Sequence, residues 1–167
     1  MTHKPSLIRA LRNLASAPWQ HRWLNDHAMQ ALENALGEAE RGHGGEIRLL
    51  IERHLPLDHW RQTARQRAED CFAHLRAWDT AARSGVLVYV NLGERRLEIV
   101  ADRGISAVVP QERWQTLCDN TLPAMRHGEY VNALARLLKD IGAEMREHYG
   151  QPDDPHGNEL PNRVEIR

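Results

Sequence analysis

Several features that identify common classes of protein are missing from this chain of 167 residues. Cysteine occurs only at Cys71 and Cys118, so no disulfide framework is indicated and a reducing compartment is expected. Both cysteines fall within helix-like apolar stripes, and we interpret them as buried thiols. The formal net charge is only -1, which excludes the strongly basic surface expected of a nucleic-acid-binding protein.

Long apolar runs and catalytic motifs are also absent. No stretch approaches the length of a membrane span, and the N-terminal residues MTHKPSLIRALRNLASAPWQHRW contain no apolar run of signal-peptide length. A soluble, cytoplasmic protein is therefore expected. The sequence has no phosphate loop, no GxGxxG, no GxSxG, no HExxH and no Cys/His set with zinc spacing. These absences remove the usual grounds for predicting a nucleotide-binding enzyme, a serine hydrolase or a zinc peptidase.

The composition is that of an ordinary globular domain, with 41% hydrophobic and 27% charged residues. We divide the chain into an N-terminal helical extension (1–25), a domain (26–150) and an extended tail that packs on it (151–167). Residues 5–24 combine a leucine-rich stripe with arginines and two tryptophans. This segment is predicted either to pack on the domain as a short helix or to lie on a membrane surface.

Hydrophobic periodicity predicts an α/β fold. Apolar residues recurring every three or four positions predict helices, and alternating or continuous short apolar runs predict strands. The expected helices are 26–41, 58–78, one starting near Pro110 and one through 130–145, and the expected strands are 46–53, 85–90 and 96–101, with 163–166 as a short edge strand. A helical crossover makes the first two strands parallel, and a turn around Gly93 makes the third antiparallel. The prediction is a small mixed β-sheet with helices packed on both faces.

Four segments together resemble the TPM domain family, in its short bacterial branch. They are GHGGEIRLLIE (42–52), WDTAARSGVLVYVNL (78–92), RRLEIVADRGI (95–105) and GNELPNR (157–163). The resemblance spans roughly residues 26–166 and implies a TPM-like fold. It also implies a choice of activities, because the family includes an acid phosphatase, proteins that bind divalent metal and a receptor-associated membrane protein. This chain has Ser84-Gly85 where the branch typically has Asn-Gly or Asp-Gly.

Strand direction predicts where a site would lie. The starts of two parallel strands and the end of an antiparallel third meet at one edge of a sheet, and the polar residues of the family-like segments gather there. Carboxylate oxygens suit calcium or magnesium, and arginine suits phosphate. We therefore predict metal ligands and ligand-binding residues at this edge. The metal ligands are Asp79, Asp102 and Glu46, and the ligand-binding residues are His43, Arg83, Ser84 and Arg103.

Structural roles for these residues are the alternative interpretation, since Asp79 could cap a turn and His43 could bond a backbone carbonyl. A competing location is the opposite edge, because ligands commonly bind at the carboxyl ends of parallel strands. That edge would use Glu52, Arg53, His54, Asn91 and His59.

The sequence predicts a non-catalytic TPM domain that binds protein partners, a metal or a small ligand. The first alternative is a divalent-metal-assisted phosphatase in which the carboxylates hold the cation and an arginine neutralises the phosphoryl oxygens. The second is a peripheral partner of envelope-associated membrane proteins. No nucleic-acid partner and no transmembrane segment are expected.

Overall fold

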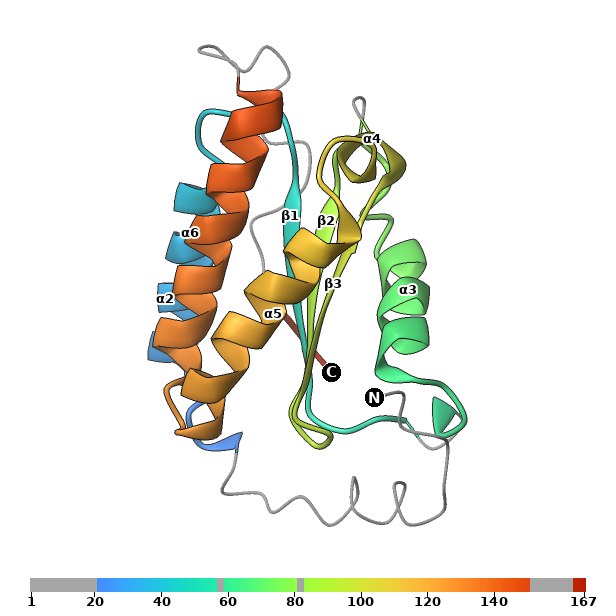
Figure 1. The fold of residues 1–167 in the computed structure, drawn as a ribbon. Coiled ribbons are helices and arrows are strands. Elements are labelled where there is room, and N and C mark those ends of the chain that lie inside the picture. Colours follow the sequence, from blue (N-terminus) through green and yellow to red (C-terminus); the bar gives the residue numbers. More distant parts are fainter. Residues whose placement is uncertain (1–20, 57–58, 81–82, 151–163) are drawn as a thin grey trace.

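The computed structural model describes residues 21–56, 59–80, 83–150 and 164–167, which form one sheet with helices on both faces (Figure 1). The predicted α/β class is confirmed. In chain order the elements are α2 (Asp26–Ala39), β1 (Ile47–Glu52), α3 (Ala64–His74), β2 (Val86–Asn91), β3 (Arg96–Ala101), α4 (Arg103–Ser106), α5 (Gln111–Arg126), α6 (Tyr130–Tyr149) and β4 (Val164–Ile166).

The four-stranded sheet has the order β3-β2-β1-β4. Strands β1 and β2 are parallel, with Ile47 opposite Val86, and β2 and β3 are antiparallel, with Val86 opposite Ala101. Strand β4 pairs in parallel with β1, which confirms the predicted edge strand. The predicted strand directions are therefore correct.

Alternation along the strands divides the core into two layers. Ile47, Leu49 and Ile51 of β1 enter the larger core, on the face that α2, α5 and α6 cover (Figure 1). Leu50 of β1 lies in the smaller cluster on the other face, together with Cys71 of α3. Burial of both faces explains why β2 is apolar with little alternation.

The helix ends follow local capping chemistry. The Asn25 side chain accepts a hydrogen bond from the Ala28 amide at 2.9 Å and starts α2. Beyond the other end of α2, Gly42 adopts the expected left-handed conformation, with φ of 80°. The second helix is shorter than the predicted 58–78, because Thr63 and Gln66 form a capping box that starts α3 at Ala64.

Two features of the helices differ from the predictions. Trp78, assigned from the sequence to a buried stripe, follows the end of α3 and is 46% exposed. Pro123, expected to kink or end its helix, does not end α5, which continues to Arg126. Pro123 has no amide to donate to the Asp119 carbonyl, so α5 lacks one hydrogen bond of its ladder there.

Both cysteines are free and buried, as predicted. Burial raises the pKa of both thiols, and that of Cys118 reaches about 12. Neither sulfur is therefore an activated nucleophile at neutral pH.

The terminal extensions lie mostly outside the described residues. This applies to residues 1–20 of the predicted N-terminal helix and to 151–163 of the predicted tail. The last residues of the extension are described, and there the Trp23 ring stacks on Tyr130 with ring centroids 4.7 Å apart. None of the helices in the described ranges is long and apolar enough to cross a membrane.

Candidate functional site

The edge of the sheet where β1 and β2 begin brings three distant segments together, as predicted. We call it the leading edge and define it as residues 43–46, 83–85 and 102–104. The Val86 amide donates to the Glu46 carbonyl at 2.8 Å, and the Asp102 amide donates to the Gly85 carbonyl at 2.8 Å. Glu46, Gly85 and Asp102 thus form the row next to the paired strands, and roughly 10 Å separates the backbones of the two acidic residues.

Gly85 in the middle of this row allows a close backbone approach. A β-carbon at this position would lie 1.6 Å from the carbonyl oxygen of Ala77. Only glycine therefore lets the segment after α3 cross here. The segment that carries Asp79 is consequently held against the start of β2.

Two of the predicted ligand-binding residues are engaged with the backbone. The Nδ1 of buried His43 accepts from the Gly45 amide at 3.1 Å, so its Nε2 carries the proton and donates to the Ala39 carbonyl at 2.7 Å. The Ser84 hydroxyl donates to the Gly44 carbonyl at 3.2 Å. Both side chains fasten the loop that precedes β1.

The predicted aspartates occupy different environments. Asp102 is buried and caps α4, accepting from the Arg103 amide at 2.7 Å. Asp79 is half exposed and forms an ion pair with Arg76 at 3.0 Å. The Arg83 carbonyl accepts from the Gly104 amide at 2.9 Å, so the exposed residue Arg83 adjoins the start of α4, which carries the exposed Arg103.

The structure adds a carboxylate that the sequence pattern did not indicate. Glu40, which follows α2, accepts from the Ile47 amide through Oε1 at 2.8 Å. Its Oε2 is buried and receives no hydrogen bond from the described donors. Burial, together with the neighbouring Glu46 carboxyl, raises the pKa of Glu40 to about 8. Two carboxyl groups in contact cannot both ionise cheaply, so Glu40 holds a proton at neutral pH.

Arg48 partly offsets this concentration of negative charge. Its positive charge acts to lower the pKa of Glu40. The Arg48 Nη1 also donates to Glu165 of β4 at 3.1 Å, and its Nε is buried without a partner in the described part of the chain. One guanidinium is therefore shared between neighbouring carboxylates.

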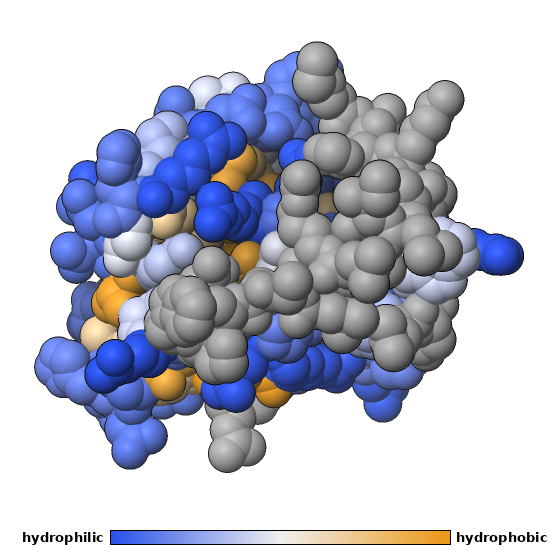
Figure 2. All heavy atoms as spheres, turned by 90° about the horizontal axis from the view of Figure 1, so that it is seen from below, coloured by the Kyte–Doolittle hydropathy of each residue, from blue (hydrophilic) through white to orange (hydrophobic). Residues whose placement is uncertain are grey.

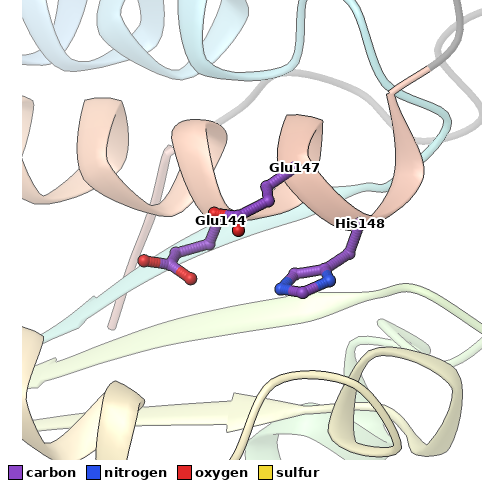
Figure 3. A group of neighbouring side chains, drawn as sticks. All are labelled: Glu144, Glu147 and His148. Atoms are coloured by element: carbon purple, nitrogen blue, oxygen red, sulfur yellow. The ribbon is translucent and has the colours of Figure 1, made fainter.

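A different trio of side chains has the spacing of metal ligands. Within the described ranges, only Glu144, Glu147 and His148 place their ligand atoms within 4.8 Å of one another, whereas the trio of Asp79, Asp102 and Glu46 does not (Figure 3). Glu144 of this helical trio is paired with Arg113, and the other two side chains are exposed. The ion pair with Arg113 accounts for the buried Glu144 carboxylate, and Glu147 and His148 follow it on the exposed last turn of α6.

The opposite edge, where β1 and β2 end, holds a buried polar network. Glu52 accepts from Arg67 Nη2 at 2.6 Å and from the Tyr89 hydroxyl at 2.6 Å, and Asn91 Nδ2 donates to that hydroxyl at 3.1 Å. Burial raises the pKa of Tyr89 well above its usual value, and the Glu52 carboxylate adds to the shift. Glu52 and Asn91 of the competing site are therefore bound within the protein.

The histidines of the competing site lie outside this network. The His54 ring packs edge-on against His21, with ring centroids 5.2 Å apart. The His59 Nδ1 is 2.9 Å from Gln62 Oε1. Arg53 is exposed, and its amide donates to the Arg167 carbonyl at 2.8 Å.

Comparison with known proteins agrees with this architecture. The sequence profile of the TPM domain matches residues 20–144. The solution structure of BA42 from the psychrophilic bacterium Bizionia argentinensis is similar, with 27% identity, a TM-score of 0.75 and coverage of 87% of this chain and 96% of BA42. The N-terminal domain of a protein from P. gingivalis shares the fold at 13% identity, with a TM-score of 0.63 over 92% of this chain and 99% of that domain.

The fold is thus that of a mixed α/β domain whose loops converge at one edge of the sheet. This chain belongs to the TPM domain family. No protein with a curated description matches it.

Proposed function

We propose that this TPM domain is a non-catalytic binding module that takes a divalent cation at the leading edge, with Glu46 as the central ligand. The observation that carries the proposal is the buried carboxyl of Glu40 beside that of Glu46, because burial and then the neighbouring Glu46 carboxyl raise the pKa of Glu40 to about 8. A divalent cation can neutralise two ionised carboxylates, whereas a proton neutralises only one. Asp102, two strands away in the same row, and Asp79 are the further ligands proposed from the sequence.

The chemistry of the donors favours calcium or magnesium over softer metals. Carboxylate oxygens are the preferred ligands of these hard cations, whereas zinc and copper prefer nitrogen and sulfur. The His43 imidazole is bonded to the backbone through both ring nitrogens. A cation at this edge would therefore be held mainly by oxygen.

A cation that binds here displaces the proton held by Glu40, and the number of protons released can be measured. Calcium and magnesium are titrated calorimetrically at pH 7 in two buffers of different ionisation enthalpy. The expected result is saturable binding with release of close to one proton. The Glu40→Gln variant should bind without this release, and the Glu46→Gln variant should lose binding. Glu38→Gln is the matched control, because Glu38 is an exposed glutamate of α2 that pairs with Arg41.

Two aspartate variants decide how many ligands the site has. Loss of binding in Asp102→Asn or Asp79→Asn would support the ligand set predicted from the sequence, and unchanged binding would restrict the site to the two glutamates. Absence of heat with calcium and with magnesium would contradict the proposed function. Binding that survives Glu46→Gln would contradict it equally.

Phosphate ester hydrolysis is a second candidate, favoured by the adjoining exposed arginines at the same edge. Neither the Arg83 nor the Arg103 side chain has an ion-pair partner in the described part of the chain. Both could neutralise phosphoryl oxygens beside a bound cation. Cation-dependent hydrolysis of p-nitrophenyl phosphate, lost in Arg83→Gln or Arg103→Gln but with calcium affinity retained, would establish this activity.

Partnership with membrane proteins remains a prediction that rests on the family resemblance, with residues 1–24 as the segment through which it would act. It is tested by salt-sensitive binding to anionic liposomes, which deletion of residues 1–20 should abolish. Equal binding by the full and shortened chains would contradict it.

A further inference from the structure

A pocket of about 300 Å³ lies at the end of the molecule opposite the leading edge. Its walls come from four places that are distant in sequence: Trp23 before α2, the turn between β2 and β3, the last turns of α5 and the start of α6. Figure 2 looks at this end from below and shows hydrophobic side chains in hollows between hydrophilic ones, beside the residues drawn in grey. The volume is at the small end of the range for ligand sites.

One part of the pocket is apolar and flat. Leu92, Leu122 and Met125 line it, and the parallel rings of Trp23 and Tyr130 form a stack with an interplanar angle of 4°. The indole nitrogen of Trp23 is buried and donates to no acceptor among the described residues. A planar apolar group can pack against such a surface.

The polar part of the pocket is cationic. Arg95 and Arg126 line it, and among the described residues no aspartate or glutamate does. Neither guanidinium forms an ion pair or a side-chain hydrogen bond with any residue that the structure describes, unlike Arg48, Arg67 and Arg113. Two unpaired guanidiniums facing one small cavity favour an anion.

The backbone around the pocket adds to this preference. The twenty-residue helix α6 begins at Tyr130 and has no side-chain cap, so its first amides are available. The carbonyls at the end of α5 are already used, because the Gly128 amide donates to Met125 at 3.0 Å and the Glu129 amide to Ala124 at 3.1 Å. The carbonyls at the negative end of α5 are thereby hydrogen-bonded, whereas no described side chain caps the positive end of α6.

The amide side chain of Asn91, which also lines the wall, is already hydrogen-bonded. Asn91 donates through Nδ2 to the Tyr89 hydroxyl and accepts the Glu94 amide through Oδ1 at 2.8 Å. It fixes the turn between β2 and β3 and has little capacity left for a ligand. A ligand in this pocket is therefore recognised by the aromatic stack and the two arginines.

We propose that this pocket binds a small organic anion with a flat apolar body, an aryl carboxylate or an aryl phosphate. The ring packs on the Leu122, Met125 and Trp23–Tyr130 surface, and the anionic group bonds the guanidiniums of Arg95 and Arg126. The site is separate from the leading edge and needs no cation.

The experiment uses the full ¹⁵N-labelled chain and four probes: phenylacetate, its neutral counterpart phenylacetamide, phenyl phosphate and inorganic phosphate. Phenylacetate or phenyl phosphate at millimolar concentration is expected to shift the amide signals of Gly128, Tyr130 and the 92–95 turn. Phenylacetamide should bind roughly tenfold more weakly, because it lacks the charge-assisted bonds. The stronger of the two anions identifies the carboxylate or the phosphate as the preferred group.

Three variants and one control locate the binding. Arg95→Gln and Arg126→Gln should each weaken phenylacetate binding roughly tenfold and leave phenylacetamide unchanged. Leu122→Trp fills the apolar part and should abolish binding of all three aromatic probes. Arg136→Gln, which removes an exposed arginine of α6 outside the pocket, should change nothing.

Several results would overturn the proposal. Equal affinity for phenylacetate and phenylacetamide would show that the arginines do not contribute to binding. Unchanged phenylacetate binding in both arginine variants would show the same. If inorganic phosphate bound as tightly as phenyl phosphate, the aromatic surface would make no contribution to binding. Shifts confined to other parts of the protein, or no shift with any aromatic anion, would reject the site.

Discussion

Replacing Glu40 by glutamine should stabilise the protein, and more so as the pH rises. Glutamine keeps the oxygen that accepts the Ile47 amide but carries no charge. The wild-type carboxyl is buried beside Glu46, and its pKa is raised from 4.5 to about 8. Its position at the C-terminal end of α2 also disfavours negative charge, because the helix dipole is negative there.

The magnitude follows from proton linkage. Between pH 4.5 and about 8 the folded protein holds a proton on Glu40 that the unfolded chain releases, so wild-type stability falls as the pH rises through this window. Each unit of pKa difference corresponds to about 1.4 kcal/mol, and the loss between pH 5 and pH 9 is therefore about 4 kcal/mol at most. The neutral glutamine variant lacks this loss, so its advantage should be small at pH 5 and largest at pH 9.

Urea denaturation of both proteins between pH 5 and pH 9 measures the difference. Subtracting one curve from the other cancels every other titrating group that the substitution leaves unchanged. Glu38→Gln is the control, because its exposed ion pair with Arg41 should be worth less than about 1 kcal/mol. Parallel stability curves for Glu40→Gln and the wild type would refute the raised pKa and the carboxyl contact on which the cation proposal rests.

Three further substitutions test the sheet and its two edges by denaturant midpoints. Leu87→Ala removes a fully buried side chain of β2 and should destabilise the protein by roughly 2–5 kcal/mol; an unchanged midpoint would contradict its place in the smaller core. Gly85→Ala places a β-carbon against the Ala77 carbonyl and should cost about 1–3 kcal/mol or more, so tolerance would contradict the close approach. Tyr89→Phe removes the hydroxyl that donates to Glu52 and should cost roughly 1–3 kcal/mol, and a neutral effect would show that the network adjusts.

The sheet could be predicted from the sequence because its signals are local. Alternation in β1, the continuous apolar run of β2 and the turn at Gly93 each lie within a few residues, and the crossover rule supplies the strand directions. The short helix α4 was missed because four residues are too few for a period to be seen. Its only local signal is Asp102, which is a capping residue as well as a carboxylate.

The candidate sites depend on contacts that no short window contains. Glu40 and Glu46 are separated by the loop that leaves α2, and only the return of the chain into β1 places one carboxyl beside the other. The pocket at the opposite end is built from four segments, and neither Arg95 nor Arg126 stands in a recognisable motif. Strand direction correctly predicted that polar segments meet at the leading edge, but side-chain packing decides which of them face one another.

The two proposed sites should bind independently, although β1 and β2 run from one to the other. Six residues of β2 separate the leading edge from the pocket, a distance of roughly 20 Å. Charges this far apart are screened, since the Debye length is about 8 Å at physiological ionic strength. Mechanical coupling would require β1 or β2 to shift, and both are buried along their whole length. Calcium should therefore change the phenylacetate affinity by less than about twofold, whereas a larger change would show that the sheet has two arrangements that both ligands sense.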